Sequence, residues 1–173
     1  PELFFYLSHA VHRNDVDLKE YLARYKAHKL ENTLPVDVDV YFAGFHTDVY
    51  DNRYSILADN IDGDTVILWI DALGAEWLPL LDWTIKEHCD GKIVSSSVGQ
   101  ATLPTETCYN DLWTRMDTPY SKLDKLDKLA HKGAVDEPDY YACIEEQLSF
   151  VSGVHKYIAD LLQKYHRVII TGD

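Results

Sequence analysis

A continuous apolar segment, residues 66–70 in GDTVILWIDALG, is the feature that most restricts the fold of this chain. A strand that is apolar at every position is expected in the centre of a sheet that helices cover on both faces. A second apolar segment, residues 168–171, precedes Gly172 and Asp173, and the first is followed directly by Asp71. Ligands of α/β proteins bind beyond the carboxyl ends of such strands, so both aspartates are candidate site residues.

Helical patterns alternate with these strands. Residues 17–30 and 139–165 place apolar side chains along one helical face, and residues 75–89 resemble a helix with Pro79 at its start or at a kink. Further strands are predicted at residues 35–45 and 91–99 and a further helix at residues 108–116, whereas the charged segment 121–133 has no clear assignment. This alternation predicts an α/β fold with a mainly parallel central sheet covered by helices.

Composition excludes several classes of protein. The chain has 173 residues, of which 46% are hydrophobic, so it can bury a sizeable core and is not disordered. Its formal net charge of -13 disfavours direct binding to nucleic acid, because the phosphate backbone is also negatively charged. The three cysteines are widely spaced and expected to be reduced. No apolar segment approaches the roughly 20 residues of a membrane span, and the start lacks signal-peptide features, so a cytoplasmic location without membrane contact is expected.

Each candidate for chemistry also has a structural interpretation. Asp71 could cap a helix or close a turn, since aspartate accepts hydrogen bonds from free backbone amides there. Asp127 and His131 in DKLAH could belong to a solvated amphipathic helix. Thr105 and Thr107, which follow Pro104, could be turn and N-cap residues. The order of the four elements along the chain decides between these interpretations.

In that order, VILWIDALGAEWLPLL, LPTETCYN, KLDKLAHKG and YHRVIITGD resemble the motifs of the PglZ domain, a branch of the alkaline phosphatase superfamily. The resemblance covers residues 64–173 and implies an alkaline-phosphatase-like fold. It also implies that the domain is incomplete, because the chain stops at the aspartate of an Asp-His-Gly motif. We therefore expect a segment at residues 1–60 leading into a partial PglZ domain at residues 61–173, within a longer protein.

The resemblance further implies two adjacent divalent metals, zinc as a rule with manganese as a second candidate. Carboxylate and imidazole ligands suit both ions. Thr107 matches the nucleophile, with Thr105 as the alternative, and Asp124 is a rival ligand that lacks the D-x-x-x-H spacing. Because further histidine ligands would lie beyond the chain, we expect its metal sites to be weak or empty. The matching metal ligands are Asp71, Asp127, His131 and Asp173.

The function implied by the resemblance is metal-dependent hydrolysis of a phosphoester, either a monoester or a diester. The family also implies bacterial defence against phage, with a DNA methyltransferase and an ATPase as partner proteins. An alternative is an interaction module with little or no turnover. Two departures favour it: the basic residue expected after Asp71 is missing, with Glu76 nearby instead, and Asn110 is no secure match for a phosphoryl-binding asparagine. A sulfatase-like or phosphoglycerate-mutase-like enzyme fits the PTET turn less well. His88, His155 and His166 are assigned structural roles.

Overall fold

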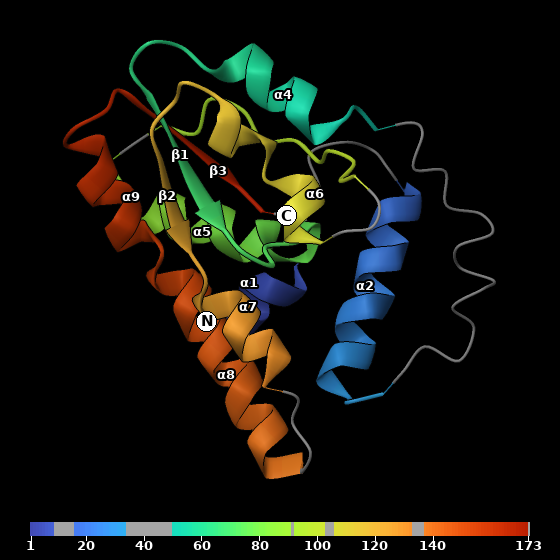
Figure 1. Cartoon of the computed structure of the whole chain (residues 1–173). Helices are drawn as coiled ribbons and strands as arrows, with labels where there is room; N and C mark the ends of the chain where they lie inside the picture. The colour runs from blue at the N-terminus through green and yellow to red at the C-terminus, as the bar shows by residue number, and fades with distance from the viewer. Residues whose placement is uncertain (9–15, 34–49, 91, 103–105, 133–136, 173) are drawn as a thin grey trace.

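The structure is a computed structural model that describes residues 1–8, 16–33, 50–90, 92–102, 106–132 and 137–172 (Figure 1). The described helices surround three strands. The strands are β1 (Thr65–Ile70), β2 (Tyr120–Leu123) and β3 (Arg167–Thr171). The helices are α1 (Glu2–Leu7), α2 (Val16–Leu30), α4 (Arg53–Asn60), α5 (Leu78–His88), α6 (Thr107–Asn110), α7 (Lys125–His131), α8 (Glu137–Gly153) and α9 (His155–Leu162), with the 3-10 turns η2 (Ala75–Trp77) and η3 (Leu112–Arg115).

The three strands form one parallel sheet in the order β2-β1-β3. All six residues of β1 are buried, as the continuous apolar segment predicts. Ile70 pairs with Leu123 of β2, and Trp69 pairs with Thr171 of β3, so the carboxyl ends of the strands meet at one edge. The predicted α/β fold with a parallel, helix-covered sheet is therefore confirmed.

Alternating residues of β1 face two separate cores. Leu68 and Ile70 pack into the larger core, which α1, α5, α7, α8 and α9 complete. Ile67 and Trp69 face the smaller core on the other side, with Leu57 of α4. Figure 1 shows the sheet between these layers, with α4 and α6 on one side and α5 on the other. This arrangement fixes Asp71, which follows β1, on the same face as Trp69.

The prediction of one long helix at residues 139–165 is wrong in one respect, because this segment contains two helices, α8 and α9. α8 ends at Gly153 and α9 begins at His155, although Val151, Val154 and Ile158 continue one buried apolar face across the break. Glycine ends helices readily because it has no Cβ to restrict the backbone. The apolar spacing therefore continues from α8 into α9, although Gly153 allows the helix to break between them.

The prediction of a strand at residues 91–99 is also wrong for residues 92–99, which the structure describes. Residues 92–99 form no strand, and the nearest sheet-like contact is a single bridge between Asn52 and Gln100. Val94 is 80% exposed, so this apolar residue has no core to cover and gains nothing from strand pairing. The strand expected at residues 35–45 lies outside the described residues, and the unassigned segment 121–133 contains most of β2 and all of α7.

Candidate functional site

Asp71 lies at the end of β1 in a tight turn. The Leu73 N–H donates to the Ile70 carbonyl oxygen at 3.2 Å, and Ala72 has a φ of 64°. Positive φ costs a residue with a Cβ about 1 kcal/mol, so the turn is held by its surroundings. The Asp71 N–H donates to the Leu123 carbonyl oxygen at 2.9 Å, which fixes the turn to the end of β2. The Asp71 carboxylate is consequently held in place, and the residue is only 7% exposed.

Both oxygens of this carboxylate have partners. The Lys122 ammonium nitrogen lies 2.5 Å from Oδ2, and the Thr107 hydroxyl donates to Oδ1 at 3.4 Å. Asp71 and Thr107 come from separate segments and were predicted as a metal ligand and the nucleophile. The structure brings these two side chains together.

Lys122 is a site residue that the sequence did not reveal. It pairs with Trp69 in the register of β2 and β1, and its ammonium lies 3.9 Å from the centre of the Trp69 ring. β2 has only four residues, alternately exposed and half-buried, so no apolar periodicity marks it as a strand. The position of Lys122 beside Asp71 follows from strand pairing, which the local sequence does not reveal.

Asn110 holds the segment that carries Thr107. Its side-chain oxygen accepts from the Thr102 N–H at 2.8 Å, and its amide donates to the carbonyl oxygens of Thr102 at 2.9 Å and Glu106 at 3.1 Å. Asn110 is 2% exposed. These bonds hold Thr102 and Glu106 to α6, so Asn110 has a structural role here and its amide is engaged within the protein.

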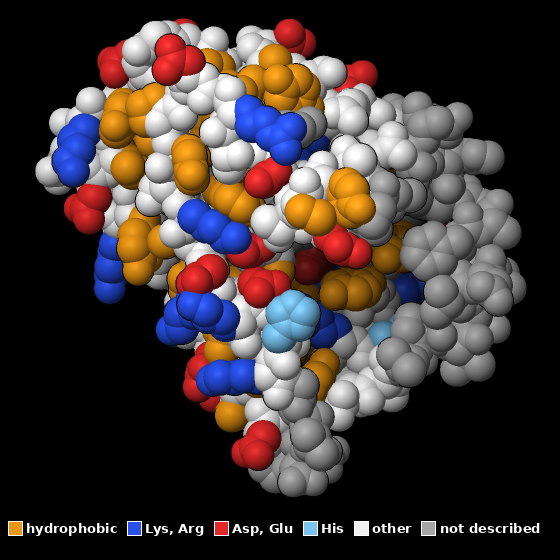
Figure 2. Space-filling view, in the orientation of Figure 1, with side chains coloured by type: hydrophobic (Ala, Val, Ile, Leu, Met, Phe, Trp, Pro, Cys, Tyr) orange, Lys and Arg blue, Asp and Glu red, His pale blue; other side chains and the backbone are white. Residues whose placement is uncertain are grey.

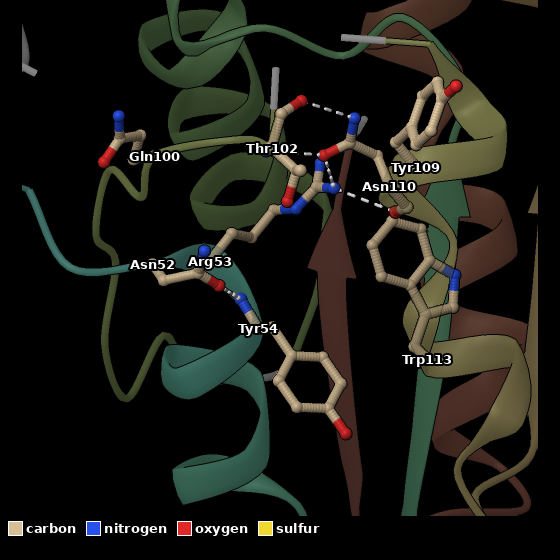
Figure 3. Close-up of a pocket in the computed structure, with 8 residues that line it drawn as sticks. All are labelled: Asn52, Arg53, Tyr54, Gln100, Thr102, Tyr109, Asn110 and Trp113. Atoms are coloured by element: carbon tan, nitrogen blue, oxygen red, sulfur yellow. Dashed lines mark hydrogen bonds between the residues drawn. The ribbon is translucent and has the colours of Figure 1, made fainter. Parts of the chain in front are cut away.

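Arg53, at the start of α4, ties this segment to the end of β3. Its guanidinium donates to the Asn110 backbone oxygen at 2.8 Å and side-chain oxygen at 2.9 Å (Figure 3). It also donates to the carbonyl oxygen of Gly172. The guanidinium carbon lies 4.7 Å from the centre of the Trp113 ring. The pocket around Arg53 and Asn110 offers about 10 Å³, room for about one water molecule.

Asp127 and His131 form a second pair of predicted site residues. Both belong to α7, and the His131 Nε2 lies 3.2 Å from the Asp127 Oδ1. The side chains are 34% and 81% exposed for Asp127 and His131 respectively. Asp124 is the rival metal ligand to Asp127. Its Oδ2 lies 2.5 Å from the Lys128 ammonium nitrogen, and the hydrogen bond from Lys128 lowers the pKa of Asp124.

The predicted metal ligands are only partly described. Asp173 and the alternative nucleophile Thr105 lie outside the described residues. Within the residues that are described, no three His, Cys, Asp or Glu side chains gather closely enough to hold a metal ion. The carboxylates and the imidazole have the right chemistry for zinc or manganese, and the Lys122 ammonium shows that the surroundings of Asp71 accept a cation. The donor chemistry thus fits a metal at Asp71, although the described part alone does not complete a centre.

Glu76 interacts with the N-terminal helix α2. Burial raises the pKa of Glu76, and the positive charges of Lys29 and Lys26 oppose that rise. Burial lowers the pKa of Lys29 and lowers that of Lys26 to about 8. Glu76 is thus part of a buried charge cluster that links the start of the chain to the turn region after Asp71.

Comparisons with known protein families, with curated proteins and with solved structures found no match to this chain. In the described part of the chain, no helix is both long enough and apolar enough to cross a membrane. On the face shown in Figure 2, Lys and Arg side chains are interspersed with Asp and Glu.

Proposed function

We propose that this chain is part of a PglZ-type, alkaline-phosphatase-like domain that hydrolyses phosphoesters with the help of divalent metals. The observation that carries the proposal is the hydrogen bond from the Thr107 hydroxyl to Asp71. A hydroxyl next to a buried carboxylate at the end of a parallel strand is arranged as a nucleophile beside a cation ligand. The motif order of the sequence supports the same assignment.

Each residue then has a stated part in the reaction. Asp71 accepts the hydrogen bond of the Thr107 hydroxyl and so directs its proton away from an incoming phosphorus atom. The Thr107 oxygen bonds to phosphorus while the bond from phosphorus to the ester oxygen breaks, and the proton released by Thr107 ends on the departing oxygen, which leaves as an alcohol. Water then attacks the phosphothreonine, the bond between phosphorus and the Thr107 oxygen breaks, and a water proton restores the hydroxyl as the phosphate product leaves. Zinc or manganese held by Asp71, Asp127, His131 and Asp173 would supply the positive charge that activates the hydroxyl and stabilises the transferred group.

The test is hydrolysis of a chromogenic phosphodiester and a phosphomonoester in the natural protein that contains this sequence, with zinc or manganese supplied. We expect Thr107→Ala to reduce turnover to the background rate. Thr114→Ala, in η3, is the matched control and should retain the native rate. Equal rates for the native protein and Thr107→Ala would show that Thr107 is not the nucleophile.

A catalytically weak interaction module is the second candidate. It is favoured by the Asp71 carboxylate, whose two oxygens already contact Lys122 and Thr107. Metal binding in the native protein without hydrolysis of either ester would support the module. Both candidates share a proposed setting, which is bacterial phage defence in the cytoplasm alongside a methyltransferase and an ATPase, and this setting rests on the sequence resemblance.

A further inference from the structure

Lys122 contacts the carboxylate that the proposed function assigns to a metal. Its ammonium nitrogen lies 2.5 Å from Asp71 Oδ2, at the distance of a short charged hydrogen bond. The side chain of Asp71 is 10% exposed, so little water competes for that oxygen. In this structure the cation beside Asp71 is therefore an amino group of the protein itself.

An ammonium ion and a divalent metal ion cannot share this position. Both are cations that bind carboxylate oxygen at close range, and two cations on one oxygen repel each other strongly where water is scarce. The other oxygen, Oδ1, already accepts the hydrogen bond of Thr107. A metal ion that binds Asp71 through Oδ2 must first displace Lys122.

The surroundings allow Lys122 to leave. Its side chain is 34% exposed, in contrast to that of Asp71, so a rotated ammonium can reach water without crossing the core. Lysine has a long flexible stem that carries its charge over apolar surface. The Trp69 ring, 3.9 Å from the ammonium, provides a face along which the charge is stabilised while it moves.

We propose that Lys122 competes with divalent metal for Asp71 and so sets the metal affinity of the site. The inference rests on the proposed role of Asp71 as a metal ligand. Without metal, the Lys122 ammonium neutralises the buried carboxylate. With metal, Lys122 gives up that contact, and its charge becomes available near Thr107.

Metal titration by calorimetry tests this competition, using manganese and zinc salts on the natural protein that contains this sequence. We expect Lys122→Met to bind metal about tenfold more tightly than the native protein, since a competing charge pair is removed. Lys122→Gln, which keeps a polar end, should also bind more tightly. It serves as the second variant if Lys122→Met does not fold.

The matched control is Lys86→Met. The Lys86 ammonium nitrogen lies 2.6 Å from Oδ2 of Asp82 on α5, and neither residue is a candidate metal ligand. The control removes the same charge from a similarly short ion pair, so a general electrostatic effect would appear in both variants. Native affinity in Lys86→Met is the expected result.

Asp71→Asn separates the competition from the proposed function. In that background Lys122→Met should give no gain, because the shared carboxylate is absent. Equal metal affinity in the native protein and both Lys122 variants, with Asp71→Asn weakening it, would overturn the competition and leave Asp71 as a ligand. Metal affinity unaffected by Asp71→Asn would overturn the ligand assignment and the competition together.

Discussion

Lys26 allows a quantitative test of the buried charge cluster. This lysine of α2 is 2% exposed, and its ammonium donates to the Tyr6 carbonyl oxygen at 2.6 Å. Burial lowers its pKa from 10.5 to about 8, and the charge of Glu76 only partly opposes this. The folded protein therefore releases the proton of Lys26 at a lower pH than the unfolded chain does.

The sign and size of the effect follow from proton linkage. Between the folded pKa of about 8 and the unfolded value of 10.5, the unfolded chain binds more protons, so the free energy of unfolding rises with pH. Over roughly pH 8 to pH 10 the rise due to Lys26 is about 2 kcal/mol. Raised tyrosine pKa values act in the opposite direction above pH 10, with that of Tyr25 raised to about 12.

Urea denaturation of the native protein and of Lys26→Met over this pH range measures the contribution. The difference in free energy of unfolding between the two proteins should change by about 2 kcal/mol, because groups common to both cancel. Lys19→Met, on the same helix, is the control and should run parallel to the native protein. A difference between native and Lys26→Met that stays constant from roughly pH 8 to pH 10 would refute the assigned burial of the charge.

Two further substitutions test how the site is held together. Arg53→Lys should lower the free energy of unfolding by about 1–3 kcal/mol, because lysine cannot maintain the forked bonds to Asn110 together with the bond to Gly172. Urea denaturation would show a smaller loss if these bonds were dispensable. Gly172→Ala should lower the melting temperature, since a Cβ there would lie 2.0 Å from the Leu73 carbonyl oxygen. Gly63→Ala, which meets nothing within 4 Å, is its control in the same thermal scan, and equal melting temperatures would contradict the close approach.

The sequence predicts an element well where the residues of that element alone determine its structure. β1 is apolar at every position and is buried throughout, and α2 follows the helical spacing expected at residues 17–30. The expected strand at 91–99 lacks such a cause, because its apolar residues are few and Val94 has no core to join. The break before α9 is marked only by Gly153, and the apolar spacing that runs across it favours one continuous helix.

The residues of the candidate site also fall into two groups, those that local sequence reveals and those that only the tertiary fold reveals. Asp71 is recognisable because it follows an unmistakable strand, and the motif order points to Thr107. Lys122 and Arg53 are not recognisable, because their contacts arise from the pairing of β2 with β1 and from the approach of α4 to the end of β3. The local sequence predicts that Asp71 follows a buried strand, whereas the partners of Asp71 depend on the tertiary fold.

The smaller core connects those partners. Lys122 lies over the Trp69 ring, the rings of Trp69 and Trp113 meet edge to face at 5.1 Å, and Arg53 lies over Trp113. The two cations at the ends of this row bind Asp71 and the carbonyl oxygen of Gly172, which belong to the ends of β1 and β3. Cation–ring contacts are strongest where water is excluded, as it is around two indoles that are 4% and 1% exposed. The smaller core therefore positions the charges at the carboxyl ends of the strands, so a substitution at either tryptophan would alter the site as well as the packing.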